Sequence, residues 1–170
     1  MHSDEKLMAS VAAGDGSALE ELLRRYERPL ASYIARHTQG MDVEDLHQET
    51  WMRIVRAAPS FDVSRRFSTW LFQIATNLCR DWHRRRRPDD RVADVDSLGV
   101  ATASRVEAAL AADALLRRLP EPQREALVLR YYHDLGADEM SEILGCPPGT
   151  VKSRIHNALA RLAELVKEEL

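Results

Sequence analysis

The stretch that decides the fold is ADEMSEILGCPPGTVKSRIHNALARL, residues 137–162. Its first eight residues repeat apolar side chains at helical spacing, and a second periodic segment starts at Pro148. Gly145 lies between them and permits the tight turn that joins two helices. The apolar residues that can form the core between these helices are Ile143, Leu144, Val151 and Ile155. The spacing therefore predicts a helix-turn-helix.

The outer side of the second helix lacks acidic residues, since no Asp or Glu occurs between Gly149 and Ala163. The polar residues on this side are Lys152, Ser153, Arg154, His156 and Asn157. Such a helix suits the major groove of DNA, where its N-terminal half meets base edges and phosphates. An ordinary helical hairpin would also have a polar outer face, but the missing acids favour DNA recognition.

The segments around this unit also predict helices. Two are expected directly before it, at residues 105–119 and 121–132. The last helix is expected to continue to residue 167, with an apolar face made of Val151, Ile155, Leu159, Leu162 and Val166. Residues 105–170 are therefore expected to form one small helical domain.

The N-terminal half predicts three more helices, at residues 18–36, 42–58 and 68–87. Ser17 is the expected N-cap of the first, because Glu20 follows three residues later as in a capping box. Pro29 is expected to bend that helix or to split it in two. Asp42 is the expected N-cap of the second helix.

Residues 88–104 separate the two halves. They show no sustained period, contain acidic and small residues, and begin with proline, so they predict a linker. Strand-type alternation is scarce, while Ala, Leu, Arg and Glu dominate. The sequence thus predicts an all-α protein with a domain at 1–87, a linker at 88–104 and a second domain at 105–170.

Composition excludes several classes of protein. The 170 residues include no apolar run of membrane-spanning length and no basic-then-apolar signal sequence. The two cysteines, Cys79 and Cys146, form no CxxC pair, which argues against a disulfide scaffold or a zinc ribbon. Phosphate-loop, nucleophile-elbow and zinc-protease motifs are absent. We expect a soluble cytoplasmic protein that is not an enzyme, with no metal, cofactor or small-molecule substrate and no membrane insertion.

Charge is unevenly distributed, although the net charge is only −3. Residues 51–87 carry nine arginines against two aspartates, while residues 1–50 carry ten acids against five bases. In the basic block, aromatic residues alternate with arginines, which suits unstacked bases and their phosphates. Trp70 and Phe72 lie off the buried stripe of their helix, and the sequence leaves open whether they stack on bases or pack against other helices.

A third pattern, DVEDLHQE at residues 42–49, puts an acidic outer face at the start of a helix. It compensates the helix dipole in the simplest interpretation. In the alternative interpretation it is a docking face for a basic protein partner.

Together these patterns resemble the sigma factors of bacterial RNA polymerase, in particular the compact extracytoplasmic-function (ECF) group with a region 2 domain, a linker and a region 4 domain. The resemblance rests on five strings in this order: DLHQETW at 45–51, FSTWL at 67–71, IATN at 74–77, LP with REA at 119–126, and GTVKSR at 149–154. Each string alone is weak, but the five at this spacing are specific.

The resemblance also implies roles for residues. Contacts to the polymerase β′ clamp would come from Asp45, Gln48 and Glu49. Contacts to the −10 promoter element would come from Phe61, Arg65, Arg66, Phe67, Ser68, Trp70, Asn77, Arg80, Arg84 and Arg85. Contacts to the −35 element would come from Thr150, Lys152, Ser153, Arg154, His156 and Asn157.

The implied partners are bacterial core RNA polymerase, through its β′ clamp and β flap, promoter DNA, and an anti-sigma factor. The implied function is that of an alternative sigma factor, which directs the polymerase to specific promoters and promotes their opening. Two alternatives use less of the sequence. A stand-alone helix-turn-helix regulator would leave residues 42–87 unexplained, and an adaptor protein would leave the acid-free helix unexplained.

Overall fold

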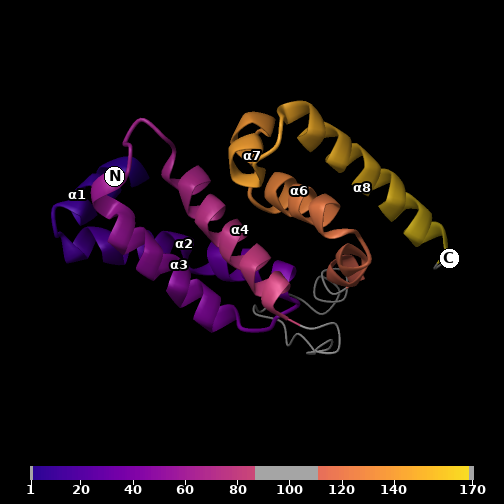
Figure 1. Ribbon diagram of the computed structural model, residues 1–170, viewed down its shortest axis with the longest axis horizontal. Coiled ribbons are helices and arrows are strands. Elements are labelled where there is room, and N and C mark those ends of the chain that lie inside the picture. Colours follow the sequence, from indigo (N-terminus) through magenta and orange to yellow (C-terminus); the bar gives the residue numbers. More distant parts are fainter. Residues whose placement is uncertain (1, 87–110, 169–170) are drawn as a thin grey trace.

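The computed structural model describes residues 2–86 and 111–168, which form two helical lobes (Figure 1). The N-terminal lobe contains α1 (Asp4–Ala12), α2 (Gly16–Thr38), α3 (Val43–Ala57), the 3₁₀ turn η1 (Ala58–Ser60) and α4 (Phe67–Arg85). The C-terminal lobe contains a helical segment at 111–117, then α6 (Glu121–Tyr132), α7 (Ala137–Leu144) and α8 (Pro148–Glu168). The described residues contain no strand, which confirms the all-α prediction.

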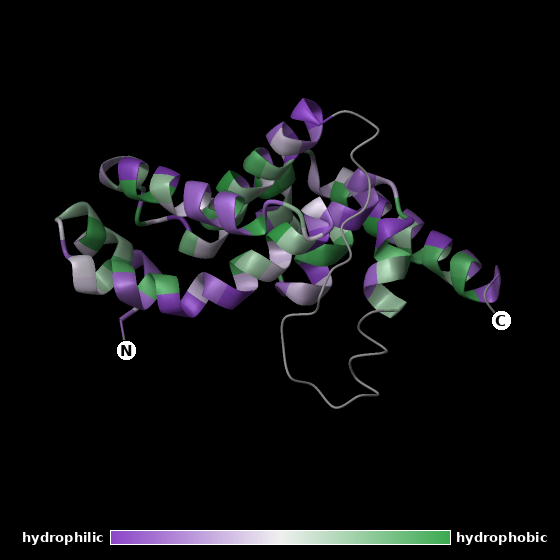
Figure 2. Ribbon diagram, turned by 90° about the horizontal axis from the view of Figure 1, so that it is seen from below, coloured by the Kyte–Doolittle hydropathy of each residue, from purple (hydrophilic) through white to green (hydrophobic). Residues whose placement is uncertain are grey.

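The helices are amphipathic, and hydrophobic and hydrophilic residues lie side by side along each of them (Figure 2). In the N-terminal lobe, α1 to α4 bury a continuous apolar core that includes Met8, Leu22, Ile34, Ile54, Phe67 and Leu71. In its interior the hydroxyl groups of Tyr33 and Thr76 are hydrogen-bonded at 2.6 Å. The predicted linker at 88–104 and the first residues of the helix predicted at 105–119 lie outside the described residues.

Details of α2 and α3 differ from the sequence predictions. The N-cap of α2 is Asp15, not Ser17, because the Asp15 carboxylate accepts hydrogen bonds from the backbone N–H of Ser17 (2.9 Å) and Ala18 (3.3 Å). Pro29 does not split α2, which continues through it as one helix. Asp42 precedes α3 but makes no capping bond; its carboxylate accepts a hydrogen bond from Trp82 Nε1 at 2.7 Å.

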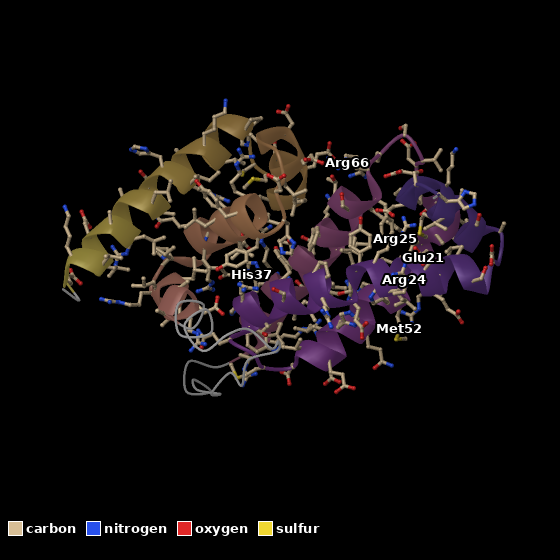
Figure 3. The ribbon with its side chains drawn as sticks, turned by 180° about the vertical axis from the view of Figure 1, so that it is seen from behind. Glu21, Arg24, Arg25, His37, Met52 and Arg66 are labelled. Carbon is tan, nitrogen blue, oxygen red and sulfur yellow. The ribbon has the colours of Figure 1, made fainter. Side chains whose placement is uncertain are left out.

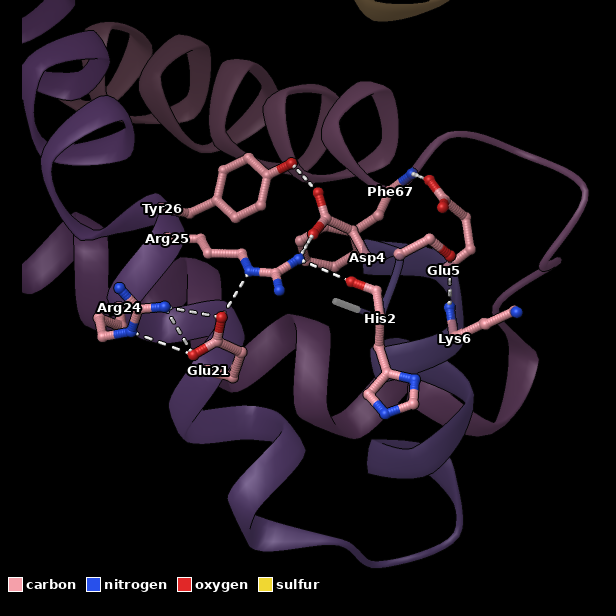
Figure 4. A network of polar contacts seen from close by, with 10 residues as sticks. His2, Asp4, Glu5, Lys6, Glu21, Arg24, Arg25, Tyr26 and Phe67 are labelled. Carbon is pink, nitrogen blue, oxygen red and sulfur yellow. Dashed lines mark hydrogen bonds and ion pairs between the residues drawn. The ribbon is translucent and has the colours of Figure 1, made fainter.

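α1 was not predicted from the sequence. Ser3 caps it, and Leu7 and Met8 are buried against the rest of the lobe. Its acidic residues reach α2 and α4 (Figure 4). Asp4 accepts hydrogen bonds from Tyr26 (2.5 Å) and from Arg25 (2.6 Å). The run Ser-Asp-Glu before an apolar pair is a helix-start signal that could have revealed α1.

The C-terminal lobe contains the predicted helix-turn-helix. Gly145 ends α7 in the left-handed conformation (φ 67°), which glycine adopts without strain, and α8 starts at Pro148. Met140, Ile143 and Val151 are buried between the two helices. The apolar stripe of α8 was predicted with a small error in register. Its buried residues are Val151, Ala158 and Leu165, whereas Leu159 and Val166 are exposed.

The two lobes are in contact. α4 packs along α7, and α2 touches α6 (Figure 1). The ring of His133, just after α6, lies 4.4 Å from the ring of Phe72 on α4 and 5.5 Å from that of Tyr33 on α2. The Arg36 guanidinium lies over the Tyr132 ring at 3.9 Å. The contact therefore has an aromatic centre, and it also includes the ion pairs described below.

Candidate functional site

The predicted docking residues lie on the outer side of α3. Asp45 and Gln48 are exposed and one turn apart, and Glu49 is half-buried. Arg53 Nε donates to Glu49 at 2.9 Å, and this hydrogen bond lowers the pKa of Glu49 below its ordinary value. We call Asp45, Gln48 and Glu49 the acidic α3 surface. Glu49 therefore stays negatively charged at neutral pH.

An apolar groove of about 600 Å³ borders the acidic α3 surface. Its apolar lining comes from Leu19, Leu23, Trp51, Met52 and Val55, and Met52 and Val55 are exposed large apolar side chains. Sequence analysis missed this groove because its walls come from two helices, α2 and α3. The acidic side chains and the groove together form a face with both charged and apolar contacts, as protein interfaces have.

The predicted −10 residues extend from the loop at 61–66 onto α4. Phe67 is fully buried at the centre of this region. The Tyr26 ring lies 5.3 Å from it, the Phe61 ring 6.1 Å and the Trp70 ring 6.3 Å. Phe61 and Trp70 are half-buried and 4.9 Å apart, so these two rings reach the surface while Phe67 supports them from below.

Phe72 belongs to the core, not to this surface. It is buried between the rings of Tyr33 and His133. Of the two roles that the sequence left open for Phe72, stacking on bases or packing against other helices, the structure therefore shows packing. Trp70 is half-buried beside Phe61 and keeps an accessible part.

α1 supports the start of α4. Arg66 precedes α4 but gives it no side-chain cap. Glu5 Oε1 supplies one from α1, since it accepts a hydrogen bond from the Phe67 backbone N–H at 3.1 Å (Figure 4). Burial raises the pKa of Glu5, but this hydrogen bond, others like it and the nearby Arg66 together leave that pKa below its ordinary value. The acid thus satisfies a free N–H group at a helix N-terminus and fixes the loop that carries Arg65 and Arg66.

The remaining predicted −10 residues follow α4 toward its C-terminus. Ser68 and Arg80 are half-buried, and Asn77, Arg84 and Arg85 are exposed. Asp81 forms an ion pair with Arg84 one turn away. We call the ten predicted −10 residues the basic–aromatic surface; nine of them are partly or fully exposed, and the buried Phe67 supports them from below.

The predicted −35 residues lie at the start of α8. Lys152, Ser153, His156 and Asn157 are exposed, while Thr150 and Arg154 are half-buried. Arg154 also lines a cleft of about 880 Å³ between the lobes, together with Asn77, Arg80 and Arg84 of α4. We call the six α8 residues the recognition surface. In this arrangement of the lobes it borders the basic–aromatic surface.

Comparison with known proteins decides the family. Residues 22–88 match the model of sigma-70 region 2, and residues 109–162 match that of sigma-70 region 4. The chain is 31% identical over 181 residues to the ECF RNA polymerase sigma factor SigW of Bacillus subtilis, covering 96% of this chain and 97% of that protein. The chain belongs to the ECF sigma factors. It is therefore an alternative sigma factor that directs RNA polymerase to promoters, in a family of transcription initiation factors.

Solved structures show that the sigma factor resembles its relatives along its whole length. It matches CnrH, solved in complex with the cytosolic domain of CnrY, with a TM-score of 0.79 and 29% identity over 99% of this chain and 100% of CnrH. It matches the Bartonella quintana sigma factor RpoE, solved with the anti-sigma factor NepR, with a TM-score of 0.76 and 26% identity over 88% of this chain and 96% of RpoE. Both lobes therefore follow the fold of the family.

The C-terminal lobe of the sigma factor has an apolar groove that sequence reasoning missed. Its lining includes Leu116, Leu127, Tyr131, Leu159 and Val166, and its volume is about 370 Å³. Tyr131, Leu159 and Val166 are exposed apolar residues, so the two residues of the predicted α8 stripe that are not buried, Leu159 and Val166, line this groove instead. The signal for the groove was present, because Tyr131 lies one helical turn after Leu127 on α6.

Two features are absent from residues 2–86 and 111–168. No helix there is long and apolar enough to cross a membrane. No group of three or more His, Cys, Asp or Glu side chains is placed to hold a metal ion.

Proposed function

We propose that the three surfaces divide the work of the sigma factor. The acidic α3 surface docks on the β′ clamp, the basic–aromatic surface captures the −10 element, and the recognition surface reads the −35 element. The C-terminal apolar groove receives the β flap. The observation that carries the proposal is the separation of charge, with exposed acids on α3 and arginines on the loop at 61–66 and on α4. The acids on α3 would then face basic groups of the polymerase, and the arginines would face the phosphates of the DNA.

The domain boundaries belong to this proposal. Residues 1–87 act as the polymerase- and −10-binding domain, residues 88–104 as the linker, and residues 105–170 as the −35-binding domain. The protein acts in the cytoplasm and contributes binding energy rather than catalytic groups. Since RpoE was solved with the anti-sigma factor NepR, we propose that a protein anti-sigma factor also binds this chain.

Run-off transcription tests the proposed function. Core polymerase is incubated with a pool of genomic promoters, with and without the protein, and transcript starts are sequenced. We expect new starts that share upstream −10 and −35 elements. Absence of new starts together with absence of binding to core polymerase would reject the proposal and favour a stand-alone helix-turn-helix regulator, which binds duplex DNA by itself.

The acidic α3 surface makes the first prediction. We expect Asp45→Ala combined with Gln48→Ala to weaken core binding roughly tenfold, because two interface contacts of this kind contribute about 1.4 kcal/mol together. Both side chains are exposed, and the loss of one acid from the first turn of α3 costs at most about 1 kcal/mol, so the fold should stay intact. Fluorescence anisotropy with labelled sigma factor measures the affinity. Glu164→Ala, an exposed acid on α8, is the control, and equal affinities of wild type and double variant would contradict the docking assignment.

The recognition surface makes the second prediction. We expect Arg154→Ala to reduce transcription from the cognate promoter by about 1–3 kcal/mol, roughly 5- to 150-fold, because a bidentate arginine contact to a base contributes that much discrimination. The loss should be largest on promoters with the intact −35 sequence. An equal loss on promoters with altered −35 sequences would make Arg154 a phosphate contact.

A further inference from the structure

The arginines at the start of the basic–aromatic surface are paired with acids of the C-terminal lobe. Arg66 Nη1 lies 2.6 Å from Glu139 Oε1, and Arg65 Nη2 lies 3.0 Å from Glu142 Oε2. Both acids are on α7, one turn apart, so they face α4 together. Figure 3 labels Arg66 at this contact between the lobes.

A third arginine is held more firmly. Arg80 donates from Nε and Nη2 to the two carboxylate oxygens of Glu125 on α6, at 3.0 and 2.9 Å. The Glu125 side chain is only 3% exposed, and Arg80 also contacts the backbone oxygen of Leu144 at 3.4 Å. This two-pronged geometry is the one an arginine uses to bind a phosphate group.

Uncharged side chains of α4 join the same contact. Gln73 Nε2 donates to the backbone oxygen of Glu142 at 3.3 Å, and Thr69 Oγ1 donates to Glu139 at 3.4 Å. The C-terminal lobe therefore places a row of carboxylate and carbonyl oxygens against α4.

We propose that Glu125, Glu139 and Glu142 form an interaction surface whose partner is the basic–aromatic surface of the same chain, and that this surface competes with the −10 DNA strand. The carboxylates occupy arginines that the phosphates of the DNA strand would otherwise bind. The proposal rests on the proposed −10 role of Arg65, Arg66 and Arg80. Because the chain must separate its lobes before it binds the strand, its affinity for DNA is reduced by the closed fraction.

The pairs differ in strength, which makes the contact reversible. Glu142 is 55% exposed and Arg66 is 68% exposed, so each of these two pairs shifts the equilibrium only a few-fold. Glu125 is only 3% exposed, so its attraction to Arg80 is offset by the hydration that the two charges lose in the contact. Polymerase, which on the proposed function binds both lobes, can therefore pull them apart.

The test removes the two α7 charges with Glu139→Gln and Glu142→Gln. Glutamine at 139 keeps an acceptor for the backbone N–H of Gly136, which Glu139 now binds at 3.0 Å, so α7 retains its cap. The control is Asp138→Asn with Glu164→Gln, which makes the same change in net charge at exposed positions of the same lobe. The probe is a labelled random single-stranded DNA of about ten nucleotides.

Two readouts are compared on the full-length chain, namely anisotropy of the labelled DNA and the radius of gyration from small-angle X-ray scattering. We expect the double variant to bind the strand roughly tenfold more tightly than wild type and to be more extended, with neither change in the control. An affinity gain equal to that of the control, with an unchanged radius, would overturn the proposal. A larger radius without any gain in DNA affinity would also overturn it and would in addition remove the −10 assignment of the basic–aromatic surface.

Discussion

We expect Phe67→Ala to lower the free energy of unfolding of the N-terminal lobe by about 3–5 kcal/mol, because deletion of a buried aromatic ring removes its apolar contacts and leaves a cavity. Phe67 is fully buried. Around it lie the rings of Tyr26, Phe61, Trp70 and, at 6.4 Å, Trp51. The two tryptophans make the measurement direct, since urea unfolding can be followed by their fluorescence.

Two further variants separate the structural role of Phe67 from its predicted role in DNA binding. Phe61→Ala should cost much less stability, because Phe61 is only half-buried. Phe67→Leu should keep most of the apolar volume and restore most of the stability. If Phe67→Leu folds normally and still supports transcription from promoters with a −10 element, Phe67 does not contact DNA itself and acts by supporting Phe61 and Trp70. A loss of less than about 1 kcal/mol in the free energy of unfolding for Phe67→Ala would contradict the packing of the surrounding rings against Phe67.

Local sequence signals predicted the helix-turn-helix well, and the reason is physical. A left-handed Gly145, a proline at the first position of α8 and buried residues on both sides of the turn all act within a few residues. The start of α4 at Phe67 also lies within one residue of the predicted start at Ser68, although the side chain that caps it comes from a distant part of the chain. Where one short segment contains its own start, stop and apolar face, its structure follows from the segment alone.

Caps and lobe contacts could not be predicted in this way. Asp42 was expected to cap α3, but it binds Trp82, forty residues away, and this bond competes with the local one. The N-terminus of α4 is capped by Glu5, 62 residues away. The contacts of Arg65 and Arg66 with α7 span 77 and 73 residues. Pairings at such separations depend on how the lobes pack, which no local pattern reports.

Acid is expected to destabilise the contact between the lobes through His133. Burial, and to a smaller extent the nearby Arg36, lower the pKa of His133 from its ordinary value to about 4. Asp113 pairs with Arg36 at 3.2 Å, and the rings of Tyr33 and Phe72 complete the surroundings of His133. The folded protein therefore holds a neutral imidazole in a place where a proton is unfavourable.

The sign of the effect follows from linkage. The unfolded chain protonates His133 near pH 6.5, whereas the folded chain does so only near pH 4, so the unfolded state binds more protons between these values. The contribution of neutral His133 to the free energy of unfolding is therefore almost fully present at pH 7, and it is lost as the pH falls through that window. At pH 5 the loss from His133 should be about 2 kcal/mol. His37, fully buried where the lobes meet, has its pKa lowered by burial as well and adds to the loss (Figure 3).

Urea unfolding at about pH 7 and about pH 5 measures this effect, since both conditions lie above the midpoint at which an ordinary Asp or Glu side chain titrates. The control is His133→Gln, which retains a polar side chain of similar size that does not titrate. Between the two conditions wild type should lose about 2 kcal/mol more than this variant. An equal loss in both proteins would mean that water reaches the His133 ring in solution, and hence that the lobes are not packed as in the closed arrangement. The pH dependence therefore tests the lobe contact independently of DNA, and it tests the aromatic part of the contact rather than the ion pairs.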